Sequence, residues 1–182
     1  MEKPVWRVRS SRYLIDSPYM RLRVDELELP NGTIVSDYYV REGAGFVSVL
    51  PLTDDNHVVL IRQYRYGSDT VGIELPAGTL DAGEEPAVCA RRELAEETGY
   101  EAARIELAAT YRPEPVRSNG FAYVFVAFGA RFTCEPNLDP TEHIVVEEVD
   151  FDEFREMLRD GRIEAGSSIA AGYLALEYLR RL

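Results

Sequence analysis

The chain has 182 residues, enough for one domain of ordinary size with a short accessory element, and its 20 Lys+Arg and 32 Asp+Glu give a net charge of -12. This charge repels polyanions and argues against extended nucleic-acid binding, although a small anionic substrate stays possible where cations mask the site. No apolar window reaches membrane-span length and the start does not resemble a signal peptide, so we expect a cytoplasmic protein without a membrane partner.

The first forty residues have the pattern of extended chain. Apolar and polar residues alternate over 19–24, the turn pair Asn31-Gly32 follows, and a second run covers 33–40, which is a hairpin pattern. We therefore predict an N-terminal β element over residues 1–42 and a main domain over residues 43–182.

The main domain mixes strand and helix patterns. Strands are predicted at 46–52, 58–61, 105–111, 123–128 and 144–149, and helices at 86–98, 151–160 and 168–179. Pro86 suits a first helical position, Gly99 suits the position after a helix, and Ser167 or Ser168 is a candidate cap for the last helix. This order predicts an α/β fold of the α+β type, with a mixed sheet between helices.

Cysteine and histidine offer little for a metal or redox site. Cys89 lies inside the first predicted helix, so it and Cys134 are interpreted as ordinary thiols. His57 and His143 are too few and too far apart in the sequence for a zinc enzyme.

The helix predicted at 86–98 carries a carboxylate patch. At 100° per residue, Glu96 and Glu97 lie about 60° and about 40° to either side of Glu93. Such a patch is a solvated face or a cradle for a hard cation such as Mg2+ or Mn2+. Gly78 has no side chain, so the backbone carbonyl of Ala77 could join the ligands.

The wider pattern favours the cradle. Gly78, Glu84, Arg92-Glu93-Leu94, Glu96-Glu97 and Gly99-Tyr100 match G-x5-E-x7-R-E-U-x-E-E-x-G-U, where U is a bulky apolar residue. The chain thereby resembles the Nudix hydrolases, with Tyr100 in place of the commoner aliphatic residue. The resemblance implies the Nudix fold, metal-dependent hydrolysis, the Ala77 carbonyl as a metal ligand, and an Arg92 that braces a catalytic carboxylate.

A metal held beside a pyrophosphate can polarise phosphoryl oxygens and activate water. The expected reaction is attack of water on one phosphorus of a nucleoside diphosphate joined to another group, which gives a nucleoside monophosphate and a phosphorylated second product. Glu93 and Glu97 are the expected principal ligands, assisted by Glu96 and Glu84.

Substrate residues are expected just before the motif. The segments Arg62-Gln63-Tyr64-Arg65 and Glu74-Leu75-Pro76-Ala77-Gly78 resemble the ADP-ribose and nucleotide-sugar branch of the family. We therefore predict that Arg65 and Glu74 bind substrate, with ADP-ribose or a nucleotide sugar such as GDP-mannose as the small-molecule partner.

The loop 111–120 departs from that branch at the position expected for the general base. The position at which ADP-ribose pyrophosphatases carry a catalytic glutamate holds Gly120 here. Glu114 and Glu142 are the alternatives, and Glu142, in a later loop, is the one predicted.

Several alternatives stay open. The N-terminal hairpin resembles the element with which this branch forms dimers, so a homodimer is expected, with a simple cap on the sheet edge as the other reading. Rival functions are a non-catalytic sensor of ADP-ribose-like ligands, a hydrolase of coenzyme A or dinucleoside polyphosphates, and an isopentenyl diphosphate isomerase, for which neither cysteine is a clear counterpart. The preferred substrate and the number of metal ions stay undetermined.

Overall fold

The computed structural model describes residues 4–182, and contacts divide the chain into two compact units. The first unit comprises the chain up to Ala44 together with Arg112–Phe121, and the second comprises Gly45–Tyr111 and Ala122–Leu182. The segment 112–121 therefore belongs to the first unit, although the predicted boundary between residues 42 and 43 assigned it to the main domain.

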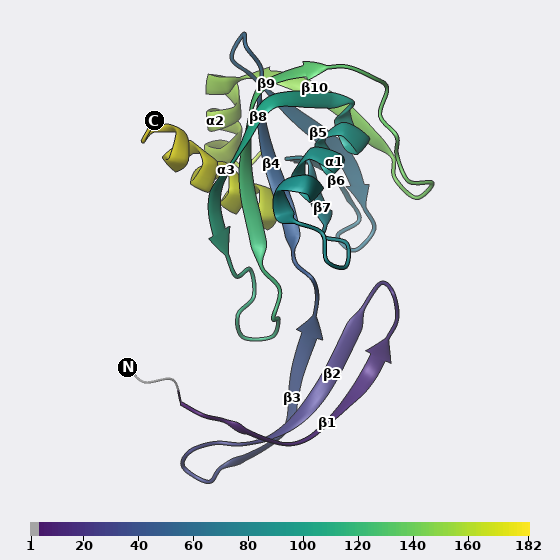
Figure 1. Cartoon of the computed structure of the whole chain (residues 1–182), viewed down its shortest axis with the longest axis vertical. Helices are drawn as coiled ribbons and strands as arrows, with labels where there is room; N and C mark the ends of the chain where they lie inside the picture. Colours follow the sequence, from purple (N-terminus) through teal and green to yellow (C-terminus); the bar gives the residue numbers. More distant parts are fainter. Residues whose placement is uncertain (1–3) are drawn as a thin grey trace. The chain divides into compact units, whose positions relative to one another are not determined.

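The first unit is built on a three-stranded antiparallel sheet in the order β1-β2-β3, whose strands are β1 (Arg7–Asp16), β2 (Arg21–Glu28) and β3 (Ile34–Glu42) (Figure 1). The predicted hairpin is confirmed between β2 and β3. Gly32 has a φ of 83°, a conformation that glycine adopts without steric cost, and the Leu29 N–H donates to the Thr33 carbonyl at 2.9 Å.

The segment 112–121 is bonded to β3. The Arg41 N–H donates to the Arg117 carbonyl at 2.7 Å, and the Gly43 N–H donates to Asn119 Oδ1 at 3.1 Å. The Tyr38 hydroxyl donates to the Val116 carbonyl. Backbone and side-chain bonds thus fix this segment within the first unit.

The second unit is a seven-stranded mixed sheet. Its main path is β10-β5-β4-β9-β8, with β6 paired to β5 and β7 paired to β4. β4 and β9 are parallel and the other pairs are antiparallel. The strands are β4 (Phe46–Leu52), β5 (His57–Arg65), β6 (Thr70–Glu74), β7 (Ala77–Thr79), β8 (Tyr100–Tyr111), β9 (Ala122–Phe132) and β10 (Ile144–Asp150).

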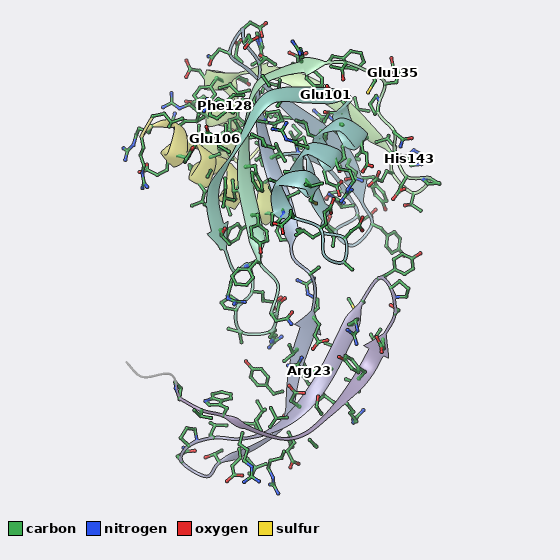
Figure 2. All side chains as sticks on the ribbon, viewed as in Figure 1. Arg23, Glu101, Glu106, Phe128, Glu135 and His143 are labelled. Atoms are coloured by element: carbon green, nitrogen blue, oxygen red, sulfur yellow. The ribbon has the colours of Figure 1, made fainter. Side chains whose placement is uncertain are left out.

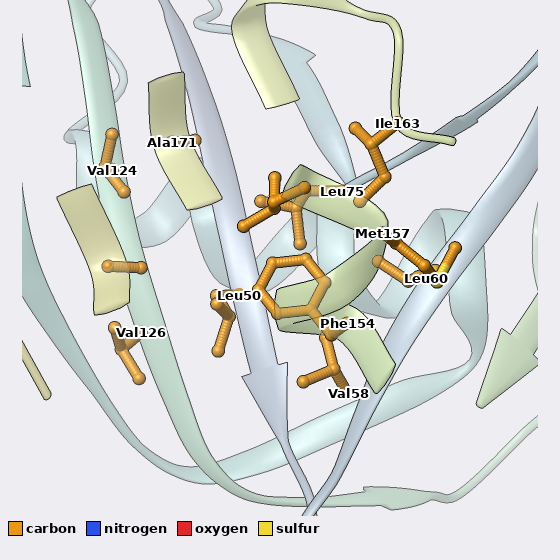
Figure 3. Close-up of a cluster of buried hydrophobic side chains, with 12 residues drawn as sticks. Leu50, Val58, Leu60, Leu75, Val124, Val126, Phe154, Met157, Ile163 and Ala171 are labelled. Carbon is orange, nitrogen blue, oxygen red and sulfur yellow. The ribbon is translucent and has the colours of Figure 1, made fainter. Parts of the chain in front are cut away.

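Helices cover both faces of this sheet, as predicted. Alternation along β4 sends Val47 and Val49 to the face covered by α1 (Pro86–Thr98), and Leu50 to the face covered by α2 (Phe151–Asp160) and α3 (Gly166–Leu179). On the second face Phe154 is fully buried among residues that include Leu50 and Leu60 (Figure 3). The two buried clusters fix the sheet between the helices.

The ends of the elements differ in part from the prediction. β8 begins at Tyr100 rather than at residue 105, and the short strands β6 and β7 were not predicted, because runs of five and three residues carry little periodicity. α1 begins at Pro86 and is followed by the left-handed Gly99, as predicted. Within residues 4–182, no helix is long and apolar enough to span a membrane.

The predicted serine cap of the last helix is wrong. α3 begins at Gly166 with Ala165 as its cap residue, so both serines lie inside the helix. Ser168 is buried, and its hydroxyl accepts a hydrogen bond from the Leu75 N–H at 3.0 Å. This serine ties α3 to the chain just before β7 instead of capping the helix.

Candidate active site

A cavity of ≈ 420 Å³ lies in the second unit where α1, β7 and the loop 133–143 meet. Glu135 and His143, labelled in Figure 2, mark that loop between β9 and β10. The structure brings seven predicted residues to the cavity wall: Arg65, Ala77, Arg92, Glu93, Glu96, Glu97 and Glu142. Glu84 and Glu74 do not line it, and each is bonded to an arginine that does.

Arg92 connects three carboxylates of the motif. Its Nε and Nη2 donate to the two oxygens of Glu84, both at 3.0 Å, and its Nη1 donates to Glu93 at 2.7 Å and to Glu96 at 2.9 Å. The planar guanidinium suits such multiple recognition, because its N–H groups point in fixed directions. One arginine therefore offsets the repulsion among neighbouring carboxylates.

Glu84 is held by the protein itself. Besides the bonds from Arg92, its carboxylate accepts a hydrogen bond from the Asp81 N–H at 3.0 Å. These bonds favour the charged form, Arg92 most strongly, and lower the pKa of Glu84 to about 2. Glu84 is thus a fixed anion that orients Arg92.

Gly78 permits the close approach of Glu93. A Cβ added at Gly78 would lie 1.9 Å from Glu93 Cδ and 2.0 Å from its Oε1, which no real side chain allows. The side chain of Glu93 therefore occupies the space that any other residue at 78 would fill. Burial is the largest cause of the raised pKa of Glu93, which Arg92 partly offsets.

Glu97 is the most deeply buried carboxylate in the cavity wall, at 3% exposure. It accepts a hydrogen bond from the Ala77 N–H at 2.8 Å, which joins α1 to β7. The pKa of Glu97 is raised to about 8, mainly by loss of solvation and in part by the charges of Glu93 and Glu142, while the hydrogen bond from the Ala77 N–H opposes the rise. A cation beside this carboxylate would stabilise its charged form.

The donor set fits a hard divalent cation. Within residues 4–182, no three His, Cys, Asp or Glu side chains already stand in an arrangement ready for a metal ion, and Arg92 holds Glu93 and Glu96. The oxygen atoms that line the cavity nevertheless include several carboxylates and the backbone, the ligands that Mg2+ and Mn2+ take, and Gly78 lets the Glu93 carboxylate approach that backbone closely.

Strand pairing brings Glu142 to the cavity. β10 pairs with β5 so that Ile144 lies opposite Gln63, and Glu142, two residues before β10, lines the same cavity as Arg65 at the end of β5. One carboxylate oxygen of Glu142 accepts a hydrogen bond from the Asp139 N–H at 3.0 Å. Glu114, the alternative base, lies in the first unit.

Arg65 and Glu74 form a two-point ion pair. Arg65 Nε and Nη2 donate to the two oxygens of Glu74 at 2.9 and 2.8 Å. The side chain of Glu74 is 7% exposed and that of Arg65 is 46% exposed. The arginine therefore faces the cavity while the glutamate lies beneath it.

Other lining residues were missed from sequence. They are Thr79, Asp81, Asn137 and Asp139, whereas Gly78, which the motif singled out, also lines the cavity. The Asn137 N–H donates to the Glu96 carbonyl at 2.9 Å, which ties the loop 133–143 to the end of α1. A sequence signal existed for Asp139, three residues before the predicted base, but nothing in the sequence indicated the contact of Asn137 with the helix.

Comparison with protein families gives two matches. A model of the NUDIX domain matches residues 45–171, and a model of the nucleoside diphosphate sugar hydrolase N-terminal domain matches residues 6–40. The first covers most of the second unit, and the second covers the three strands of the first unit up to Val40.

Relatives with different names are similar over most of their length. The chain is 35% identical to a methanol dehydrogenase activator of Bacillus methanolicus (87% of this chain, 86% of the relative) and 32% identical to an ADP-ribose pyrophosphatase of Bacillus subtilis (86% and 85%). It is 31% identical to a GDP-mannose pyrophosphatase of Klebsiella pneumoniae (85% and 81%). A crystal structure of an ADP compounds hydrolase has a TM-score of 0.84 at 22% identity, covering 100% of this chain and 96% of that one, and shows the same fold.

Proposed function

We propose, from the premise that this chain belongs to the Nudix hydrolase family, that it hydrolyses the pyrophosphate bond of a nucleoside diphosphate joined to a sugar. The products would be a nucleoside monophosphate and a sugar phosphate. The observation that carries the proposal is the buried Glu97, whose raised pKa and position beside Glu93 suit a carboxylate completed by a cation. A solvated helix face would leave such a carboxylate exposed.

Glu93, Glu96, Glu97 and the Ala77 carbonyl would hold Mg2+, with Mn2+ as a substitute. The bound ion supplies charge neutralisation at the pyrophosphate and a lower pKa for an attacking water. Within the protein, Glu97 gives up its proton, and Arg92 keeps Glu93 and Glu96 in place through its bonds to them. Arg65, which also lines the cavity, would offer N–H groups to the phosphate oxygens.

Glu142 is the proposed general base. It lines the cavity, and the described residues give its carboxylate one hydrogen bond, from the Asp139 N–H. The second oxygen can then take the proton of a water that attacks phosphorus. The Glu142 N–H also donates to the Asp139 carbonyl at 2.9 Å. The turn 139–142 is therefore closed by two hydrogen bonds, which fix the position of the carboxylate.

The substrate is proposed to be ADP-ribose or a nucleotide sugar such as GDP-mannose. The N-terminal family match and the two pyrophosphatases among the relatives support this class. We expect a panel of ADP-ribose, GDP-mannose, UDP-glucose, coenzyme A and diadenosine polyphosphate with Mg2+ to give the highest kcat/KM for one of the first three. Highest activity on coenzyme A or the dinucleotide would contradict the proposal, and binding without turnover would indicate a sensor.

The bond that breaks can be located with labelled water. Hydrolysis in 18O water should place the label in one of the two phosphate products, because water attacks phosphorus. Absence of label from both products would refute attack at phosphorus.

We further propose that the first unit forms a homodimer. β1 is an edge strand of ten residues, every one of them exposed, and its apolar side chains include Val8, Leu14 and Ile15. An exposed apolar edge strand of this length invites pairing with another chain. Gel filtration with light scattering should give twice the chain mass, and a monomer at all concentrations would contradict the dimer.

A further inference from the structure

Two Arg–Glu pairs on β5 share one geometry but face opposite sides of the sheet. Arg62 donates through Nε and Nη2 to Glu147 at 2.6 and 3.1 Å, and Arg65 donates through the same atoms to Glu74 at 2.9 and 2.8 Å. Alternation along the strand turns residues 62 and 65 to different faces. Of these four residues, only Arg65 lines the acidic cavity.

The Arg65–Glu74 pair runs diagonally across β5 and β6. Arg65 lies opposite Thr70, Gln63 opposite Gly72, and Ile61 opposite Glu74, so the arginine reaches past a glycine to its partner. A Cβ added at Gly72 would lie 3.8 Å from Glu74 Oε1, in ordinary contact. The carboxylate of Glu74 therefore lies beside the glycine, and the arginine extends along the sheet to reach it.

This pairing uses one edge of the guanidinium. The bonds to Glu74 occupy the Nε–H and one Nη2–H, so the N–H groups of Nη1 and the second one of Nη2 remain. Glu74 lies beneath with 7% of its side chain exposed, and the half-exposed arginine turns its other edge to the cavity. A second edge of this shape matches two oxygens of a phosphate.

Glu74 also has competitors for Arg65. The hydrogen bonds to Glu74 are the largest cause of the raised pKa of Arg65, and the nearby charges of Glu97 and Glu142 also raise it. Without Glu74, the arginine would turn towards these two carboxylates, one a proposed metal ligand and the other the proposed base. An ion pair there would neutralise the groups that the reaction uses.

We propose that Glu74 is a positioning residue that does not touch the substrate: it fixes Arg65 so that the free edge of the guanidinium binds a substrate phosphate and stays off Glu97 and Glu142. This inference rests on the proposed function, since it needs a pyrophosphate in the cavity. It assigns the two neighbouring residues different roles, Arg65 in contact with the phosphate and Glu74 acting through Arg65.

The test compares Glu74→Gln, Arg65→Lys, the double variant Arg65→Lys/Glu74→Gln and the control Glu147→Gln. Calorimetry with Mg2+ measures the affinity for an ADP-ribose analogue in which a methylene replaces the bridging oxygen. Glu74→Gln should weaken binding roughly tenfold, as loss of an orienting partner does elsewhere. Arg65→Lys should weaken binding at least as much, and the double variant no further, because both changes remove one arrangement. Glu147→Gln should leave the affinity unchanged.

Thermal unfolding distinguishes a residue that positions Arg65 for the substrate from one that only stabilises the sheet. Glu74→Gln and Glu147→Gln should lower Tm by similar amounts, because each breaks one two-point pair between strands. Unchanged affinity in Glu74→Gln, or losses that add up in the double variant, would overturn the inference while the wild-type activity leaves the proposed function standing. A wild-type protein that neither binds the analogue nor hydrolyses any nucleotide sugar would overturn both.

Discussion

Glu84 and Glu97 belong to one motif, yet the protein surrounds them in opposite ways. Glu84 accepts hydrogen bonds from Arg92 and from the Asp81 N–H, and its pKa falls to about 2. Glu97 is buried, accepts a hydrogen bond from the Ala77 N–H, and has a pKa raised to about 8. The protein satisfies both carboxylate oxygens of Glu84 with hydrogen bonds, whereas Glu97, within residues 4–182, accepts only one, from the Ala77 N–H.

The difference assigns their roles. A carboxylate already bonded through both oxygens has little to offer a metal ion or a proton, and it serves to hold Arg92. Burial makes the charged form of a carboxylate unfavourable and raises its pKa, and a bound cation would stabilise that charged form. Such groups are concentrated at functional sites. This contrast supports the proposal that Glu97 is a metal ligand and that Glu84 holds Arg92 in position.

The largest effect should come from Glu97→Gln. Loss of a metal ligand removes several kcal/mol of charge stabilisation, so kcat/KM for the preferred nucleotide sugar should fall by on the order of 10^3 or more. The amide keeps the volume and can still accept from the Ala77 N–H, so the fold should persist. Glu101→Gln, an exposed change just past α1, is the control and should retain activity. Retained activity in Glu97→Gln would contradict its assigned role.

The next effect distinguishes the two candidate bases. Glu142→Gln should lower kcat by about 10^2 or more, the range of general acid–base catalysis. Glu114→Gln should change kcat little, since Glu114 lies in the first unit, outside the cavity wall. The reverse result would move the base to the segment 112–121.

Arg92→Met tests the other side of the comparison. It leaves Glu84, Glu93 and Glu96 without their shared partner, so activity should fall by about 10- to 100-fold, as for other residues that orient ligands. Arg91→Met is the matched control on the same helix, since Arg91 donates to the Ala102 carbonyl at 3.2 Å. Equal losses in steady-state assays of both variants would show that Arg92 has no special role.

The smallest effect is on the stability of the metal-free protein. A carboxyl group whose pKa rises on folding binds more protons in the folded state, so stability falls as pH rises from its ordinary pKa of 4.5 to about 8. Tm in EDTA should therefore decrease between about pH 5 and about pH 8, and the slope should flatten in Glu97→Gln. An equal slope in both proteins would place the titration elsewhere.

The sequence predicted the local features of this site well. Pro86 and Gly99 marked the ends of α1, and a 3.6-residue period placed Glu93, Glu96 and Glu97 on one arc. These features depend on neighbours within a turn or two of helix. The overall class, a mixed sheet between helices, also followed from the order of the patterns.

What could not be predicted depends on contacts between distant segments. The depth of Glu97 comes from β7 lying against α1, and the position of Glu142 comes from the pairing of β10 with β5. Ser168 was predicted to be a helix cap because serine suits that position, and the sequence does not show its hydrogen bond with the Leu75 N–H, 93 residues earlier. Two Arg–Glu pairs on one strand likewise differ only in the face of the sheet that they occupy.

The central claim is that the carboxylate of Glu97 binds a divalent cation. Calorimetric titration of Mg2+ near pH 7, in two buffers of different ionisation enthalpy, tests it directly. Because the pKa of Glu97 is about 8, binding should release about one proton per ion, and Glu97→Gln should lose both that release and most of the affinity. Binding of Mg2+ that releases no proton and is equally tight in Glu97→Gln would contradict the account.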